Sequence, residues 1–209
     1  MIKGDETKNI ILKTGWEMAS RLGLECVTIG TLARETGMSK SGLFAHFQSK
    51  ENLQIAILEY AAENFRDKVI IPALKTERGI PRIKALVNNW IKWGAQLTGN
   101  CIFVLVGTEF SARPGKVRDY LIKHQDGWID CLQRIAISAV KARDFREDID
   151  YQQFAFDLYS LLLGFHYYDK LLHNGEIKQK QELALKRLLD AYCPANRKTK
   201  KIQLPKKSK

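Results

Sequence analysis

Apolar residues recur at helical spacing along almost the whole chain of 209 residues. Ile11, Gly15, Met18 and Leu22, for example, are three or four positions apart, and such positions lie on one face of a helix. Strand-like alternation of useful length and internal repeats are both absent from the sequence. The pattern therefore predicts an all-α fold of about nine helices.

The first fifty residues contain several helix boundaries close together. Gly23 follows the first apolar stripe at the position where a left-handed C-cap is favoured. Thr28 is a good N-cap for a short second helix that buries Leu32. This helix stops at Gly37, because glycine adopts a positive φ without steric penalty and allows a sharp turn.

Two further serine caps follow this turn. Ser39 begins a third helix with Leu43 and Phe47 facing inward, and Ser49 begins a long fourth helix that we expect to end before Pro72. Two short helices joined by a glycine-containing turn form a helix-turn-helix pattern. Spacing alone fits any small helical bundle with tight turns equally well.

The residues within this pattern carry a more specific signal. The stretch GMSKSGLFAHFQSKENL, residues 37–53, resembles the N-terminal DNA-binding region of the TetR family of bacterial transcriptional regulators, and the likeness extends over about residues 5–60. Two later stretches, GNCIFVLVGTEFSARPGKVRDYL (99–121) and FAFDLYSLLLG (154–164), are similar to the ligand-binding half of one TetR subgroup. The resemblance implies a three-helix DNA-binding domain at 1–50 and a ligand-binding and dimerisation bundle at 51–193. Composition predicts a basic, disordered tail at 194–209.

The resemblance also implies which residues face DNA. The third helix would enter the major groove, where its N-terminal N–H groups and small side chains meet the duplex. Lys40 can reach a phosphate or a guanine edge. Phe44 stands where the family commonly has a tyrosine that contacts phosphate, so its contact would be apolar. The expected DNA-binding residues are Thr28, Ser39, Lys40, Ser41, Gly42, Phe44, His46 and Lys50.

The remaining helices are expected from about Pro81 and over 101–112, 116–143, 151–173 and 178–192. The resemblance places a small-molecule effector among them, and ligand sites are mostly apolar with a few polar groups. Aromatic residues at helical spacing are also the ordinary content of a core. The candidate effector-binding residues are Trp90, Trp93, Phe103, Phe110, Trp128, Tyr159 and His166.

The last two helices would form a four-helix dimer interface with their copies in a second chain. The candidate interface residues are Leu161, Leu162, Leu185, Leu188 and Leu189. Glu109 and Arg113 stand four apart, which favours an ion pair within one helix over a ligand clamp.

Charge and cysteine content agree with a DNA-binding protein of the reducing cytoplasm. The formal net charge is +11, and seven of the positive charges follow Pro194 without any acidic residue. A basic protein suits nucleic acid, although a basic terminus is also commonly solvated. The four cysteines, at 26, 101, 131 and 193, show no CxxC spacing. We expect no secretory signal, membrane span, cofactor or metal.

These observations predict a DNA-binding transcriptional regulator and not an enzyme. It would be a repressor that binds a palindromic double-stranded operator as a homodimer and is released by a small-molecule effector. A nonspecific DNA-coating protein is the first alternative, because of the basic tail. A small all-helical enzyme or a thiol sensor is the second, although no nucleophile elbow or phosphate loop supports it.

Overall fold

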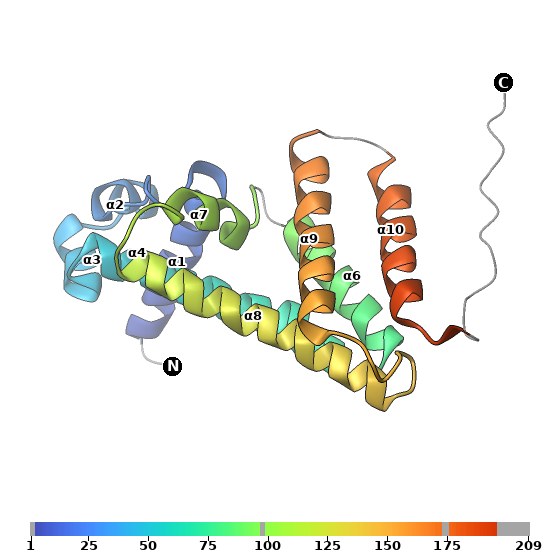
Figure 1. Ribbon diagram of the computed structural model, residues 1–209. Coiled ribbons are helices and arrows are strands. Elements are labelled where there is room, and N and C mark those ends of the chain that lie inside the picture. The colour runs from blue at the N-terminus through green and yellow to red at the C-terminus, as the bar shows by residue number, and fades with distance from the viewer. Residues whose placement is uncertain (1–2, 97–98, 173–175, 196–209) are drawn as a thin grey trace, which may run out of the picture. The chain divides into compact units, whose positions relative to one another are not determined.

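Every regular element in the described residues, which are 3–96, 99–172 and 176–195, is a helix (Figure 1). This computed structural model confirms the all-α prediction. The chain divides into two compact units, one of residues 1–77 and 81–131 and the other of residues 78–80 and 132–209. We call them unit 1 and unit 2. The functional boundaries at residues 50 and 193 stay predictions, and the tail from residue 196 onward lies outside the described residues.

Unit 1 begins with four helices whose caps match the sequence prediction. Gly23 and Gly37 have φ values of 87° and 69°, in the left-handed region that favours glycine. The Ser39 and Ser49 side chains accept hydrogen bonds from the backbone N–H groups of the third helical residue that follows each. The helices are α1 (Lys3–Leu22), α2 (Ile29–Thr36), α3 (Lys40–Phe47) and α4 (Lys50–Phe65).

The α2 cap is more elaborate than the sequence predicts. The Thr28 hydroxyl accepts from the Thr31 backbone N–H at 3.0 Å, and the Thr31 hydroxyl accepts in return from the Thr28 N–H at 2.8 Å. This is a capping box in which threonine takes the place usually held by glutamate or glutamine. It fixes the start of α2, one of the two helices of the helix-turn-helix.

The fourth helix, α4, ends at Phe65, before Pro72 as predicted, but the helical path does not stop there. Helix α4 continues through a π-helical turn, η1 (Arg66–Ile70), into α5 (Ile71–Leu74). The Ile71 N–H reaches back to the Arg66 carbonyl, five residues earlier, and Pro72 then stands in the first turn of α5. Proline is tolerated there because its missing N–H is not needed.

Helix α1 packs directly on α4, and a glycine allows the close approach. A Cβ on Gly15 would lie 2.6 Å from the Ile57 Cδ1 atom, so with a larger residue the Ile57 side chain or the helix would have to shift. Leu32, Leu43 and Leu53 are fully buried in the same unit. Three more helices have most of their residues in unit 1, and the last of them runs on into unit 2: α6 (Ile80–Gln96), α7 (Ile102–Phe110) and α8 (Lys116–Lys141).

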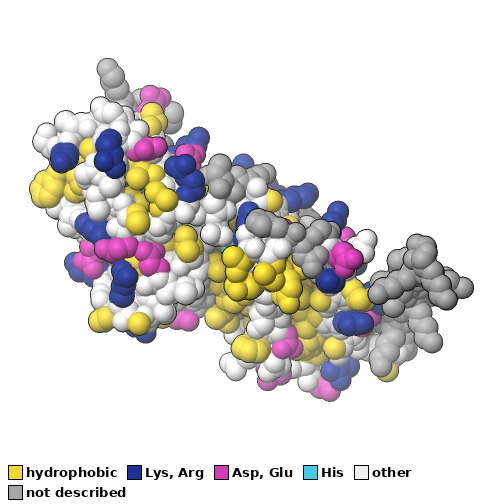
Figure 2. Space-filling model, turned by 90° about the horizontal axis from the view of Figure 1, so that it is seen from above, with side chains coloured by type: hydrophobic (Ala, Val, Ile, Leu, Met, Phe, Trp, Pro, Cys, Tyr) yellow, Lys and Arg dark blue, Asp and Glu magenta, His cyan; other side chains and the backbone are white. Residues whose placement is uncertain are grey.

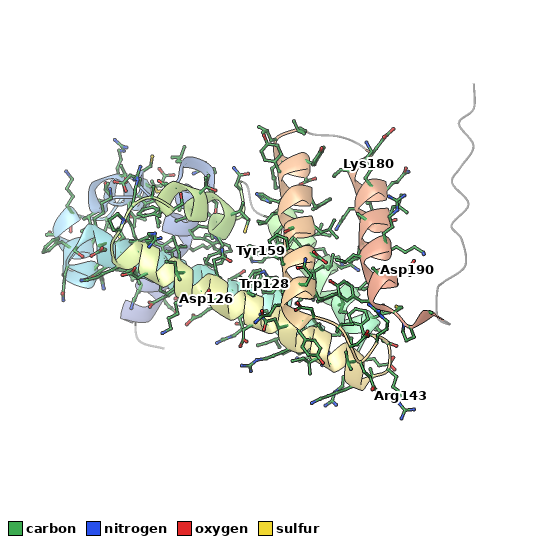
Figure 3. The ribbon with its side chains drawn as sticks, viewed as in Figure 1. Asp126, Trp128, Arg143, Tyr159, Lys180 and Asp190 are labelled. Atoms are coloured by element: carbon green, nitrogen blue, oxygen red, sulfur yellow. The ribbon has the colours of Figure 1, made fainter. Side chains whose placement is uncertain are left out.

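Unit 2 is built on two helices that lie side by side, α9 (Tyr151–Lys170) and α10 (Ile177–Tyr192) (Figure 1). Arg143 follows the end of α8 with a φ of 61° (Figure 3). Next to it, the Asp144 carboxylate accepts a hydrogen bond from the Ile80 N–H at 2.8 Å, and the Asp150 side chain caps α9. Among the residues described, none of the helices combines the length and the apolarity that a bilayer crossing needs.

Candidate functional site

Helix α3 presents a polar and chemically varied outer face. Lys40, Phe44 and His46 are exposed, and Phe44 retains 55% of its accessible surface. Leu43 and Phe47, on the opposite face, are buried at 0% and 4% exposure. The inward and outward residues of α3 therefore separate as the sequence predicts, and the exposed face is free to meet a partner.

The small residues of this region fit closely around the caps. The Ser39 hydroxyl accepts from the Gly42 N–H at 3.1 Å and lies 3.3 Å from the Ser41 hydroxyl. A Cβ on Gly42 would approach the Ser39 oxygen to 3.1 Å, which is tighter than most real contacts. Gly42 therefore protects the α3 cap, a role that its spacing in the sequence does not reveal.

Lys50, at the start of α4, belongs to a chain of three charged side chains. Its ammonium group pairs with Glu25, whose other oxygen lies 3.3 Å from an Arg113 guanidinium nitrogen. The hydrogen bond from Lys50, assisted by the charges of Lys50 and Arg113, holds the pKa of Glu25 below its ordinary value. On the face of the molecule that Figure 2 shows, basic side chains also lie among acidic ones.

Three of the candidate effector residues meet in unit 1. Trp93, Phe103 and Trp128 surround Phe65 of α4, with ring centroids 5.1, 6.1 and 5.1 Å from it and planes nearly perpendicular. Edge-to-face packing of this kind is favourable for aromatic rings. Figure 3 marks Trp128 on α8. We call these four residues, together with Trp16 and His124, the aromatic cluster.

Trp16 and His124 complete the cluster and were not predicted. Trp16 stacks on Trp93 at 6.0 Å, and His124 stacks on Phe103 at 3.9 Å. The Trp16 Nε1 and His124 Nδ1 atoms are buried and have no hydrogen-bond partner within the described part of the chain. Burial lowers the pKa of His124 to about 4, so its ring is neutral at pH 7. The spacing of His124 and Trp128, four apart on α8, is the one signal that could have found the histidine.

The other effector candidates lie elsewhere. Phe110 packs under the Arg113 guanidinium at 5.5 Å, and Trp90 is buried. Tyr159 and the buried His166 are on α9 in unit 2 (Figure 3). Burial, with a further effect of Lys170, lowers the pKa of His166. A role for these four residues in effector binding stays a prediction.

Two parts of the chain match models of one protein family. Residues 11–57 match the family model described as "Bacterial regulatory proteins, tetR family", and residues 79–182 match the model described as "Tetracyclin repressor-like, C-terminal domain". The chain belongs to the TetR family. It is therefore a DNA-binding transcriptional regulator.

Relatives of the chain are also TetR-type regulators. It is 38% identical over 56 residues to the uncharacterized HTH-type transcriptional regulator YerO of Bacillus subtilis, a match that covers 27% of this chain and 19% of YerO. A TetR regulator from Chloroflexus aurantiacus has a similar structure, with a TM-score of 0.79, 21% identity and coverage of 90% of this chain and 95% of that one. AibR, solved with isovaleryl coenzyme A and operator DNA, has a TM-score of 0.69, 20% identity and coverage of 86% and 96%.

The residues that we predict for a TetR dimer interface differ in exposure. Leu162, Leu185 and Leu189 are buried within the chain itself, whereas Leu161 and Leu188 are half-buried. Large exposed hydrophobic side chains also lie on α9 and just beyond it, and Figure 2 shows hydrophobic side chains at the surface of the molecule. They are Phe156, Tyr167, Tyr168, Leu171 and Leu172.

The predicted ion pair between Glu109 and Arg113 of this TetR-family chain is replaced by other contacts. The Glu109 carboxylate accepts hydrogen bonds from the backbone N–H groups of Leu24 and Glu25, at 2.8 and 2.9 Å. Arg113 pairs instead with the Glu25 side chain. The sequence prediction failed because both partners come from the turn between α1 and α2, more than eighty residues away.

Proposed function

We propose that this TetR-family regulator is a ligand-responsive repressor that binds a palindromic operator as a homodimer and leaves it when a small molecule binds. The observation that carries the proposal is the exposed face of α3, with Lys40, Phe44 and His46 outward and its hydrophobic residues buried. A second short helix of a helix-turn-helix reads base edges in the major groove.

The contacts on this face would fall into two kinds. Thr28, Ser39 and Lys50 would contact phosphates, which fixes the position of α3 on the duplex. Lys40 would hydrogen-bond a guanine edge, and Phe44 would pack on a thymine methyl group. His46, Ser41 and Gly42 would line the remaining surface.

A dimer would place two copies of α3 in successive major grooves, about 34 Å apart. The exposed hydrophobic side chains of α9, with Phe156 at 67% exposure, support an interface made by α9 and α10. Leu188→Glu would bury an unpaired carboxylate in that interface, so the variant should sediment as a monomer and bind operator poorly. If the variant still sedimented as a dimer, the interface would have to lie outside α9 and α10.

The aromatic cluster is the part of the effector site that the contacts support best. Its rings offer an apolar surface, while Trp16 Nε1 and His124 Nδ1 offer hydrogen bonds that no side chain of the described residues takes up. AibR, similar in fold, was solved with a coenzyme A thioester and operator DNA. An effector acts only through its different affinity for the two states, typically with about 1–3 kcal/mol of coupling.

Selection of bound DNA from a random pool, with the full chain, tests this function. We expect enrichment of an inverted repeat with half-sites about one helical turn apart. Enrichment of no sequence would favour a DNA-coating protein instead. Repeating the selected binding reaction with a panel of metabolites would then identify a compound that releases the operator.

A further inference from the structure

The turn between α1 and α2, residues 23–27, is held from outside the DNA-binding domain. Glu109 of α7 uses one carboxylate oxygen for the Leu24 N–H, at 2.8 Å, and the other for the Glu25 N–H, at 2.9 Å. Hydrogen bonds to an ionised carboxylate are roughly twice as strong as neutral ones. Helix α7 packs on α1 (Figure 1).

Three further contacts show how tightly the turn is defined. The buried Gln54 side chain of α4 donates to the Leu24 carbonyl at 3.0 Å, on the other side of the turn. Gly23 lies against Glu109, and a Cβ there would approach both carboxylate oxygens to 3.2 Å. The Thr31 hydroxyl donates to the Cys26 carbonyl at 3.0 Å. Helices α4 and α7 therefore fix the turn from both sides, and α2 is tied to its end.

This turn sets the place of residues that the proposed function assigns to DNA. It ends at Thr28, the cap of α2, and α2 packs on α3. The Glu25 side chain also pairs with Lys50, so a shift of the turn would move a phosphate-binding lysine. Glu109 itself faces the turn and not the exposed face of α3, so it would act through these residues.

Helix α7 also reaches the aromatic cluster. Phe103 stacks on His124 and packs against Phe65, six residues before Glu109 on the same helix. Six residues of α-helix span about 9 Å, so Phe103 and Glu109 stand near the two ends of one short helix. A molecule that displaces Phe103 would therefore shift the carboxylate that holds the turn.

We propose that Glu109 is a positioning residue for DNA binding, which locks the turn before α2 and transmits to it the position of α7. The inference rests on the proposed function, since it concerns the operator that the chain is proposed to read. It goes beyond that function by naming a contact through which α7 controls the DNA-binding helices.

The test compares Glu109→Gln with Glu17→Gln, using the full chain and the DNA selected from the random pool. Both variants lose one negative charge, but Glu17 is exposed on α1 and leaves the turn intact. Glutamine has one acceptor oxygen where glutamate has two, and its NH2 group can only donate, so it cannot accept from Leu24 and Glu25 with separate oxygens. We expect Glu109→Gln to bind operator about 10-fold more weakly, while its affinity for random DNA stays equal or rises because a negative charge is lost. Glu17→Gln should keep the ratio of operator to random affinity within twofold.

Backbone amide hydrogen exchange gives a second readout on the same proteins. In Glu109→Gln the Leu24 and Glu25 amides should exchange at least 10-fold faster, while the amides in the middle of α1 keep their rates. A purely structural role would lower operator and random affinity together. Operator affinity within twofold of wild type, or unchanged exchange at Leu24 and Glu25, would overturn the inference. Wild-type protein that fails to discriminate operator from random DNA would overturn the proposed function, and this inference with it.

Discussion

Two groups of aromatic side chains, one in each unit, differ in how their polar atoms are satisfied. In unit 2, Phe145, Phe154 and Tyr192 pack with centroids 5.0–5.7 Å apart, and the Tyr192 hydroxyl donates to Asp157 at 2.7 Å. In the aromatic cluster of unit 1, the Trp93 Nε1 donates to Asn64 at 2.8 Å, but two buried nitrogens have no partner in the described residues.

The difference separates a group that stabilises the fold from one suited to a ligand. A buried polar atom without a hydrogen bond costs about 1–3 kcal/mol, so its persistence asks for an explanation. In unit 2 the Tyr192 hydroxyl has its hydrogen-bond partner, so burial of the three rings accounts for the whole arrangement. In unit 1 the missing partners are what an effector would supply. Three stability measurements test this difference between the two groups, and they are given in order of decreasing effect.

Truncation in unit 2 should have the largest effect on stability. Phe154 is fully buried, so Phe154→Ala should lower the free energy of unfolding by about 3–5 kcal/mol in urea denaturation. Gln152→Ala, at an exposed position on the same helix, serves as the control and should stay within about 0.5 kcal/mol of wild type. If Phe154→Ala lowered the free energy of unfolding by less than about 1 kcal/mol, the structural role of this group would be contradicted.

Lowering the pH should destabilise the protein through the buried His124 of unit 1. The pKa of His124 falls from 6.5 to about 4 on burial, so the unfolded chain takes up a proton that the folded chain refuses between these values. Stability is therefore unaffected by His124 above pH 6.5 and declines by up to about 3 kcal/mol as pH falls to 4.

The check is denaturation of wild type and His124→Phe across this pH range. The wild type should lose more stability than the variant. His166, whose pKa is also lowered, contributes equally to both proteins, so only the difference between them counts. If the free energies of unfolding of the two proteins changed in parallel with pH, the His124 ring would be solvated and its burial would not affect stability.

The smallest effect comes from a matched pair of substitutions that each remove polar atoms. Tyr192→Phe deletes a hydroxyl bonded to a carboxylate and should cost about 1–2 kcal/mol at pH 7.5. His124→Phe deletes a buried nitrogen that has no partner, which relieves the cost of burying it, so this variant should lose no stability and should gain up to about 1 kcal/mol. If both variants lost the same stability in thermal or urea denaturation, the two groups would not differ in how their polar atoms are satisfied.

Local chemistry explains why the helix-turn-helix could be predicted from the sequence. The caps at Thr28, Ser39 and Ser49 and the left-handed Gly23 and Gly37 depend on neighbours within a few residues, and all five are confirmed. Helix boundaries in the bundle were also close, since periodicity is a local property.

Contacts that join distant segments could not be predicted in the same way. The Glu109 carboxylate offers no sign in the sequence that it will meet amides of the turn before α2, and its spacing to Arg113 suggested a different pair. Trp16 and Phe65 join the aromatic cluster only because α1 and α4 pack together. The passage of a helix through Pro72 required a π-helical turn that propensity does not foresee.

We propose that α3 reads DNA sequence while Lys50 contacts the phosphate backbone. Affinities of wild type, Lys40→Ala and Lys50→Ala for the selected operator and for random DNA, at several salt concentrations, separate the two roles. The account predicts that Lys40→Ala loses about 1–3 kcal/mol on the operator and blurs sequence preference. Lys50→Ala should weaken binding to all DNA alike and reduce the salt slope by about one unit. The same uniform loss in both variants would contradict the account, because Lys40 would then contact phosphate and α3 would not read sequence through it.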